Sequence, residues 1–455
     1  MPLRDKIKYW KYNNQRKNTG AFCFAPFNTL RFSVTGQVQI CCRNRYRTIG
    51  NISENSIETL WNNNSINNFR ESLRNYNLYD GCQFCEQMLH SKNYFFLKSL
   101  DYDSFQEKTN DTIIRKLEFE LSNICNFECI MCSGELSSSI RKHVEHLDPI
   151  PSFYNDDFIT QLRPLWKDIR RVIFGGGEPF LNSLYYKIWD EIQWHNPAIE
   201  SIITTNGSIL NEQIKLLLEK GNYFFTVSMD SFEKETFEQI RKKSVFENVM
   251  NNFEYFYEYS MKRGRWITIN VCPLINNWKG IPSMINYMNK RSINVYFNQV
   301  DFPLTVSLRS LTSHKLIEIY QYYTAFKFEL YNNYATKQNL NMFSALVKQI
   351  YYLIKEISQL EKLNLPSVLT IKEAKDLLIK HFINKSRNFY NYSSIVESSV
   401  NKINDAIELI RNENAAIEGI KIFCQEPDYI FVSEIVYTTA EKLAIRLQQS
   451  FKTHC

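Results

Sequence analysis

Three cysteines stand within eight residues of this 455-residue chain: Cys125, Cys129 and Cys132 in the stretch SNICNFECIMCSG. Thiolates are the soft ligands that iron–sulfur clusters select, and a cluster that only transfers electrons normally has four of them. Three thiolates leave one iron of a cubane cluster open to bind another molecule. The alternatives are a zinc knuckle or a set of buried thiols, but a structural zinc site takes four ligands, usually with a C-x2-C rhythm.

Polar residues and glycines follow several apolar runs after this cysteine stretch. Residues 170–180 read RRVIFGGGEPF, a short apolar run that opens into a glycine turn with Glu178. A backbone without Cβ atoms can approach a ligand closely. The run SIITTNGSIL leads to Asn206, and YFFTVSMDSF leads to Ser228 and Asp230. Read from the residues alone, these endings are also typical of plain turns and of helix caps.

The C-x3-C-x2-C spacing directly after the strand-like KLEFELS resembles the signature of the radical S-adenosylmethionine (radical SAM) superfamily, and the glycine turn resembles its GGEP motif. In that family the open iron chelates S-adenosylmethionine, whose reductive cleavage yields a 5'-deoxyadenosyl radical that abstracts hydrogen from a substrate. The cofactors then perform the hard chemistry, while the protein binds, orients and excludes water. The resemblance implies a [4Fe-4S] cluster, S-adenosylmethionine and an electron donor such as flavodoxin or ferredoxin.

The resemblance also assigns residues around S-adenosylmethionine. It implies that the methionine amino group is held by Gly176, Gly177, Glu178 and Pro179. It places near the ribose and the methionine Asn206, Ser228 and Asp230. Met131 stands where the family often has an aromatic residue that stacks on adenine, and a polarizable thioether can make a comparable contact. The fifth apolar run, WITINVCPLINN, has no glycine-rich match to the pattern that some relatives place beneath adenine.

A second group of cysteines precedes the first. Cys23, Gly36 and Cys41 fit the C-x(9–15)-G-x4-C opening of the SPASM and twitch auxiliary-cluster domains, and GCQFCEQ adds two more thiols. The C-x5-C-x3-C of a second auxiliary cluster is missing. The resemblance therefore implies one auxiliary [4Fe-4S] cluster, held by Cys23, Cys41, Cys82 and Cys85.

Two alternatives remain open for these thiols. Cys42 competes with Cys41, and because neighbouring residues of a strand point in opposite directions, only one of the two can face a cluster. A zinc site made by the same four cysteines is also possible, since spacing does not name the metal.

Six apolar, β-rich runs separated by helix-length segments must position the chemical residues. They lie near 116–122, 170–174, 201–205, 223–229, 266–272 and 294–300. This alternation predicts parallel strands with crossover helices, and six units match the partial (β/α)6 barrel of the resembled family. Chemistry should then collect at the carboxyl ends of the strands, where every motif above is found. We expect an α/β chain with an auxiliary-cluster domain (1–110), a radical SAM partial barrel (111–307) and a helical C-terminal region (308–455).

Two further segments carry weaker signals. Residues 233–259 are amphipathic and long, which is typical of a helix packed outside a barrel. From about residue 308 onward the apolar residues follow helical periods, broken near Pro366 and Pro427, and we expect this region to cover the barrel mouth or hold substrate.

Cys272 closes the fifth strand, where its thiol could donate a hydrogen atom to a substrate radical; the alternative is a buried small hydrophobic residue.

Composition limits the partners. Eleven cysteines are too few for a disulfide scaffold of this size, and seven are assigned to clusters, so a reducing cytoplasm is expected. No secretory segment or run of eighteen apolar residues is present, which argues against a membrane partner. The net charge of +6 is mild. The basic stretch at residues 3–17 is more typical of a solvated arm than of a nucleic-acid contact.

Together these patterns predict a two-cluster radical enzyme with oxidative outcomes, such as dehydrogenation or crosslinking. By resemblance alone, a ribosomally made peptide is the first choice of substrate. A small-molecule dehydrogenase acting on a sugar or alcohol comes next, and an epimerase that uses Cys272 is third. A metal-stapled scaffold that binds a partner without turnover is the alternative from another class, although such a scaffold has no use for the GGGEP turn.

Overall fold

The computed structural model describes residues 20–44, 47–78, 81–105, 112–301, 303–361, 369–387 and 392–449. The basic stretch 3–17 and Cys455 lie outside these residues, as does Pro366. Within the described residues no helix combines the length and the apolar character that a membrane span requires.

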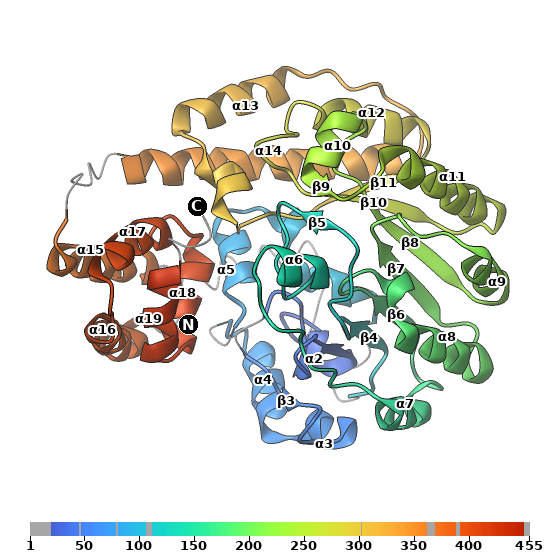
Figure 1. Ribbon diagram of the computed structural model, residues 1–455, viewed down its shortest axis with the longest axis horizontal. Helices are drawn as coiled ribbons and strands as arrows, with labels where there is room; N and C mark the ends of the chain where they lie inside the picture. The colour runs from blue at the N-terminus through green and yellow to red at the C-terminus, as the bar shows by residue number, and fades with distance from the viewer. Residues whose placement is uncertain are drawn as a thin grey trace.

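A nine-stranded sheet forms the centre of the molecule, in the order β11-β10-β8-β7-β6-β4-β1-β2-β3 (Figure 1). The six strands expected from the sequence are all present and parallel: β4 (Lys116–Phe119), β6 (Arg171–Phe174), β7 (Glu200–Thr205), β8 (Tyr223–Ser228), β10 (Ile267–Val271) and β11 (Asn294–Phe297). The crossovers are helical, with α8 (Ser183–His195), α9 (Glu212–Lys220), α11 (Phe246–Lys262) and α12 (Ile281–Lys290). The mixed α/β fold with a partial barrel is therefore confirmed.

Aromatic packing fixes the barrel strands against their helices. Phe119 and Phe174 are paired in register on β4 and β6, with ring centroids 5.7 Å apart. Phe174 also packs edge-on against Trp189 of α8, which is fully buried. Such contacts add about 0.5–1.5 kcal/mol each beyond the buried area. The strand ends that carry the site thus project from a rigid layer.

The N-terminal module shares the barrel's sheet. Strand β1 (Thr29–Phe32) pairs in parallel with β4, and β2 (Gln37–Gln39) and β3 (Gly50–Asn51) extend the sheet in antiparallel fashion. The module's helices are α2 (Ala25–Asn28), α3 (Ile57–Asn62), α4 (Asn64–Arg74) and α5 (Gln83–His90). A domain boundary near residue 110 stays a prediction, because the sheet continues across that point.

The amphipathic segment 233–259 is not one helix. It is divided into α10 (Lys234–Ile240) and the start of α11 by a short strand, β9 (Arg241–Lys242), which is followed by Lys243 at a φ of 68°. Strand β9 pairs with β5 (Glu128–Cys129) inside the three-cysteine loop. The amphipathic period missed this break because three consecutive cations also suit the exposed face of a helix.

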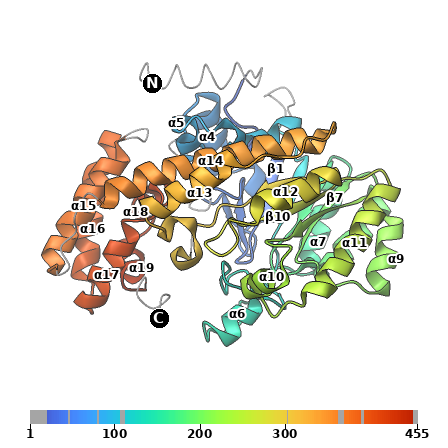
Figure 2. The same cartoon turned by 90° about the horizontal axis from the view of Figure 1, so that it is seen from above.

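The C-terminal region is helical, as expected. Helix α14 (Tyr334–Glu361) packs on β11, α12 and α13 (Ser313–Ala325), and leads to a separate group of helices on the far side of the N-terminal module (Figures 1 and 2). That group comprises α15 (Ile371–Ser386), α16 (Tyr392–Glu408), α17 (Glu413–Phe423), α18 (Asp428–Tyr437) and α19 (Ala440–Gln449). Pro427 directly precedes α18, which contacts α5. The last helices are thereby brought beside the N-terminal module.

Candidate active site

The loop that follows β4 holds the three clustered cysteines. Cys129 lies in β5, where pairing with β9 fixes its backbone, and the backbone N–H of Cys132 donates to the carbonyl of Cys129 at 3.0 Å. Farther along, Ser137 closes the loop by donating its hydroxyl to the carbonyl of Phe127 at 2.7 Å. These bonds hold Cys125, Cys129 and Cys132 close enough that each thiol influences the pKa of another.

The glycine turn after β6 supports this loop directly. The backbone N–H of Gly177 donates to the carbonyl of Ser122 at 2.9 Å, and that of Glu178 donates to the carbonyl of Ile124 at 2.7 Å. A Cβ atom on Gly177 would lie 2.0 Å from the Ile124 carbonyl oxygen. Gly176 has a φ of +96°, which favours glycine, and its Cβ would lie 2.6 Å from the Ser122 oxygen. The close approach that these glycines allow is therefore made by the backbone just before Cys125.

Glu178 connects two strand ends. Its side chain is 1% exposed and accepts hydrogen bonds from the Thr205 hydroxyl at 2.8 Å and the Asn206 backbone N–H at 2.7 Å. Burial raises the pKa of Glu178 to about 7, although these donors act in the opposite direction. Pro179 begins the short 3-10 turn that follows. Glu178 thus fixes the end of β7 relative to the glycine turn.

Asn206 extends this link to the first cysteine. Its Nδ2 donates to Oδ1 of Asn126 at 3.0 Å and lies 3.9 Å from Sγ of Cys125. Its Oδ1 accepts the backbone N–H of Ser208 at 2.8 Å, so the side-chain amide is held in one orientation. Of the polar strand ends expected near S-adenosylmethionine, this one lies directly beside the cysteine loop.

Asp230 lies at the end of β8 and is fully buried. Its Oδ2 pairs with Nη2 of Arg241 at 2.7 Å, and its Oδ1 accepts the backbone N–H of Cys272 at 2.7 Å. Burial raises the pKa of Asp230, while Arg241 lowers it. Ser228 ends β8 opposite Asn270 and is half-buried. Asp230 thus connects β8, β9 and β10 at the mouth of the barrel.

Arg241 is a residue that the sequence reasoning missed. Its Nη1 lies 3.9 Å from Sγ of Cys129, so a buried guanidinium stands beside the three-cysteine loop. A cation there would balance the negative charge of thiolate ligands. The residues IRKKS gave no signal that separates Arg241 from Lys242 or Lys243, because only the pairing of β9 with β5 selects it.

The four cysteines of the N-terminal module line one small cavity. Cys23, Cys41, Cys82 and Cys85 border it, whereas Cys42 does not. A hydrogen bond with Cys41, together with the charges of Lys98 and Arg31, lowers the pKa of Cys42 to about 6 against the opposing effects of burial and Glu118, so Cys42 has two cations near it. The structure thus brings together the four residues expected as ligands.

The donor chemistry of both groups fits iron–sulfur clusters. Removal from water raises the pKa of Cys129 to about 12 and those of Cys132 and Cys85 to about 11. Such thiols stay protonated at neutral pH unless a metal displaces the proton. Among the residues that the structure describes, no three Cys, His, Asp or Glu side chains converge as ligands of a single metal ion. Cys132 lines the chamber at the barrel mouth, and the four N-terminal thiols line the small cavity of their own module.

Alanine at Cys41 is expected to remove about four of about eight irons per chain after reconstitution, whereas alanine at Cys42 is expected to leave the iron content unchanged. The reason is that only Cys41 borders the four-cysteine cavity. Iron and sulfide analysis of the two purified variants, beside the unmodified protein, checks this. Equal iron loss in both variants, or loss only in Cys42→Ala, would contradict the assignment.

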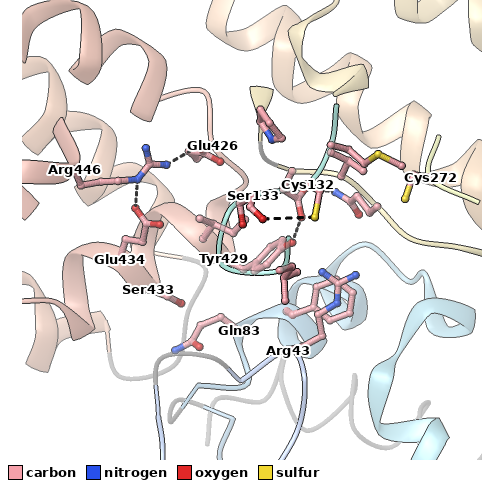
Figure 3. Close-up of a pocket in the computed structure, with 18 of the residues that line it drawn as sticks. Arg43, Gln83, Cys132, Ser133, Cys272, Glu426, Tyr429, Ser433, Glu434 and Arg446 are labelled. Atoms are coloured by element: carbon pink, nitrogen blue, oxygen red, sulfur yellow. Dashed lines mark hydrogen bonds and ion pairs between the residues drawn. The ribbon is translucent and has the colours of Figure 1, made fainter. Parts of the chain in front are cut away.

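A chamber of about 570 Å³ lies between the three-cysteine loop, the N-terminal module and the C-terminal helices (Figure 3). Its walls come from four parts of the chain: the three-cysteine loop, the barrel mouth, the N-terminal module and helices α18 and α19. Met131, Cys132 and Cys272 face it from the first two parts. Burial raises the pKa of Cys272 well above its usual range, so this thiol keeps its S–H bond at neutral pH.

The comparisons with known proteins agree with this arrangement. The radical SAM superfamily matches residues 119–285, and SPASM, an iron–sulfur cluster-binding domain, matches residues 23–86. GTP 3',8-cyclase of Sulfurimonas denitrificans is 25% identical over 188 residues, which cover 41% of this chain and 56% of that protein. The enzyme of the same name from Aliarcobacter butzleri is 27% identical over 182 residues, covering 40% and 54%. The chain therefore spans about half the length of the curated relatives it matches.

Among solved structures, anSMEcpe with bound AdoMet is similar at 17% identity and a TM-score of 0.36, over 46% of this chain and 58% of that one. Streptococcus suis SuiB bound to precursor peptide SuiA is similar at 13% identity and a TM-score of 0.33, over 57% and 58%. The two matched domains imply [4Fe-4S] clusters, one of them auxiliary, together with S-adenosylmethionine. The chain therefore contains a radical SAM domain over residues 119–285 and, ahead of it, an SPASM iron–sulfur cluster-binding domain over residues 23–86.

Proposed function

We propose that this enzyme oxidatively modifies or crosslinks a ribosomally made peptide. The observation that carries the proposal is the single chamber bordered both by the three-cysteine loop, through Met131 and Cys132, and by the auxiliary module, through Arg43 and Phe84. Its volume of about 570 Å³ is that of a typical ligand site. A reacting side chain placed there would lie beside the three-cysteine loop and against the module that carries the other four cysteines.

Each group of thiols has a distinct role in this proposal. S-adenosylmethionine at a cluster held by Cys125, Cys129 and Cys132 supplies the hydrogen-abstracting radical, and a cluster held by the four N-terminal cysteines can take up an electron. The chain's own residues orient the reactants: Glu178 and Asn206 fix the strand ends, and helices α18 and α19 enclose the substrate. Flavodoxin or ferredoxin in a reducing cytoplasm would be the electron donor.

The chamber's charges bear on the substrate class. Three carboxylates line it, from Asp301, Glu426 and Glu434, against the guanidinium groups of Arg43 and Arg446. A nucleoside triphosphate needs more cations than this. These charges disfavour a GTP-like substrate and favour a peptide or a neutral alcohol. A small-molecule dehydrogenase, or an epimerase in which Cys272 donates its hydrogen atom, remains the alternative.

Anaerobic reconstitution with iron and sulfide, followed by dithionite and S-adenosylmethionine, tests the proposal. About eight irons per chain and formation of 5'-deoxyadenosine by mass spectrometry are expected. A peptide substrate carrying deuterium on the reacting carbon should pass the label into 5'-deoxyadenosine. Bound zinc, or about four irons without 5'-deoxyadenosine, would instead identify a metal-stapled scaffold without turnover.

A further inference from the structure

The C-terminal wall of the chamber carries more negative than positive charge. Arg446 of α19 pairs with Glu426, which directly precedes α18, through Nη2 and Oε1 at 3.0 Å. The same guanidinium pairs with Glu434 of α18 through Nε and Oε2 at 3.0 Å (Figure 3). Among the residues that line this wall, two carboxylates therefore share one guanidinium.

Glu426 is the member of this group with an unused acceptor. Its side chain is 1% exposed, and Oε2 is buried without accepting a hydrogen bond from any group that the structure describes. A buried carboxylate oxygen left without a donor costs about 1–3 kcal/mol or more. Burial raises the pKa of Glu426 to about 7; Arg446 lowers this pKa and Glu434 raises it. Because Glu426 lines the chamber, a ligand in the chamber can supply the missing donor.

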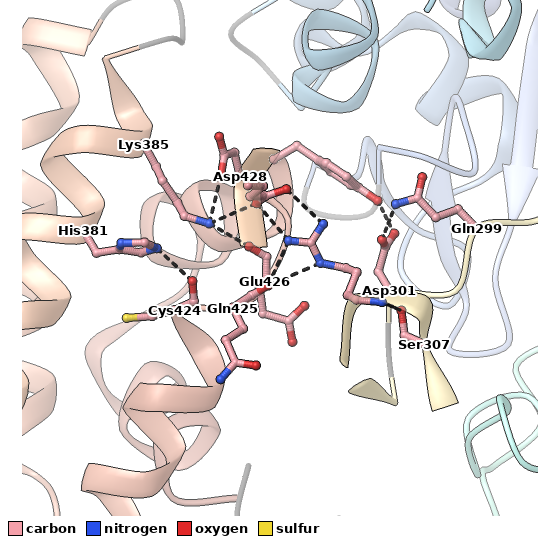
Figure 4. A network of polar contacts seen from close by, with 12 residues as sticks. Gln299, Asp301, Ser307, His381, Lys385, Cys424, Gln425, Glu426 and Asp428 are labelled. Carbon is pink, nitrogen blue, oxygen red and sulfur yellow. Dashed lines mark hydrogen bonds and ion pairs between the residues drawn. The ribbon is translucent and has the colours of Figure 1, made fainter. Parts of the chain in front are cut away.

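The backbone of Glu426 is held in place by buried cations (Figure 4). The carbonyl of Glu426 accepts from Nζ of Lys385 at 2.8 Å, and that of Gln425 accepts from Nη2 of Arg309 at 2.9 Å. Arg309 and Lys385 both pair with Glu356, at 2.8 and 3.5 Å. This network fixes the backbone from which the Glu426 side chain projects.

The other charged groups of the chamber already have partners among its residues. Asp301 accepts from the Tyr429 hydroxyl and from Nε2 of Gln299, the latter at 2.6 Å. The Arg43 guanidinium lies 4.5 Å from the centre of the Phe84 ring. Asp301 and Arg43 thus have partners within the protein, whereas the buried Oε2 of Glu426 has no hydrogen-bond donor among the described residues.

We propose that Glu426 binds a primary ammonium group of the substrate through Oε2, and so selects a lysine side chain or a free amino terminus. This proposal rests on the peptide substrate proposed above. A guanidinium is less suitable because it binds carboxylates through two parallel hydrogen bonds, and Oε1 is already bonded to Arg446. An ammonium is a point charge that a single oxygen can accept.

Proton linkage gives this contact a measurable signature. An ammonium beside Oε2 stabilises the carboxylate and lowers its pKa, so binding at pH 6 must release a proton from Glu426. With a pKa of about 7 in the free enzyme, the ionised fraction rises about tenfold between pH 6 and pH 8. The affinity for an ammonium should rise by about the same factor, while lysine itself stays charged throughout.

Isothermal titration calorimetry of the reconstituted enzyme, without reductant, tests the proposal. The probe is N-acetyl-Gly-Lys-Gly-amide, compared with its acetyl-lysine counterpart and with Gly-norleucine-Gly-amide, which offers only an amino terminus. Titrations at pH 6 in phosphate and in Bis-Tris, and at pH 8 in phosphate and in Tris, report proton release from the buffer dependence of the heat. We expect tighter binding at pH 8, proton release at pH 6, and at least tenfold weaker binding of the acetyl-lysine peptide.

Glu426→Gln should remove both the pH dependence and the proton release, because it keeps an acceptor for Arg446 but cannot ionise. The matched control is Glu418→Gln, on α17 of the same helical region, whose carboxylate is about half exposed and pairs with Lys421. It should bind as the unmodified protein does. If Glu426→Gln does not fold, the buffer comparison on the unmodified protein still decides.

Three outcomes would each overturn the proposal. They are equal binding of the lysine and acetyl-lysine peptides, unchanged binding by Glu426→Gln, and no binding of either ammonium probe. Stronger binding of the norleucine peptide than of the lysine peptide would assign Glu426 to an amino terminus. Since the titrations need no turnover, the two proposals fail separately. Formation of 5'-deoxyadenosine without ammonium binding rejects the role of Glu426, and ammonium binding without 5'-deoxyadenosine rejects the radical function.

Discussion

Replacing Cys129 by alanine is expected to abolish 5'-deoxyadenosine formation while leaving about half of the iron in the reconstituted protein. Cys129 is the member of the three-cysteine loop that lies in β5 and beside Arg241, so its loss leaves two thiols and an uncompensated guanidinium. Loss of a metal ligand should exceed the 10–100-fold effects that follow changes around metal ligands. Mass spectrometry of 5'-deoxyadenosine after addition of dithionite, together with iron analysis, measures both effects.

The matched control for this variant is Cys424→Ala. Cys424 is also buried and loses the same atoms, but it lies at the end of α17, outside both cysteine groups. It should keep about eight irons and its activity. Turnover that survives in Cys129→Ala would show that the catalytic assignment of the three-cysteine loop is wrong.

Replacing Gly177 by alanine is expected to destabilise the protein by about 3 kcal/mol or more and to remove iron from the three-cysteine site. The added Cβ would lie 2.0 Å from the carbonyl oxygen and 2.5 Å from the carbonyl carbon of Ile124, directly before Cys125. Backbone atoms on both sides leave no flexible side chain to move away. The loop must therefore shift and carry its first cysteine with it. Urea unfolding of the purified apoprotein and iron analysis after reconstitution measure the two effects.

Gly175→Ala is the control two residues earlier in the same turn. Its Cβ would meet the carbonyl oxygen of Phe119 at 3.6 Å, which is an ordinary contact. The free energy of unfolding should change by no more than about 1 kcal/mol. A similar loss of stability in both variants would indicate a general need for glycine in this turn, and the specific contact between Gly177 and the cysteine loop would not be supported.

Sequence reasoning predicted the barrel well because its signals are local. Each of the six strands is a short apolar run, and β-rich runs bounded by turns mark strands wherever both faces are buried. The same reasoning described residues 233–259 as one long amphipathic segment packed outside the barrel and missed β9 within it. Strand β9 depends on β5, more than a hundred residues earlier, and no local pattern contains that pairing.

The candidate site likewise combines features that the sequence predicted with features that only the structure shows. The cysteines predicted as ligands and the glycine turn were visible in the sequence because cluster ligands typically stand a few residues apart, so their spacing itself indicates the chemistry. The structure shows that Gly177 packs on the cysteine loop and that both oxygens of Glu178 are engaged with protein donors, neither of which the motif reveals. Whether these residues also hold S-adenosylmethionine stays a prediction.

The sequence by itself thus determined the fold class and the cofactors of this enzyme, since both depend on patterns confined to short segments. Only the tertiary structure decided which residues line the chamber that we propose for the substrate. Arg43, Cys132, Cys272 and Glu426 are hundreds of residues apart at the extremes and line one chamber because the sheet, α5 and α18 bring them there. Long-range packing selected Arg241 beside Cys129 in the same way, since the free energy of burying a charge depends on its partner in space.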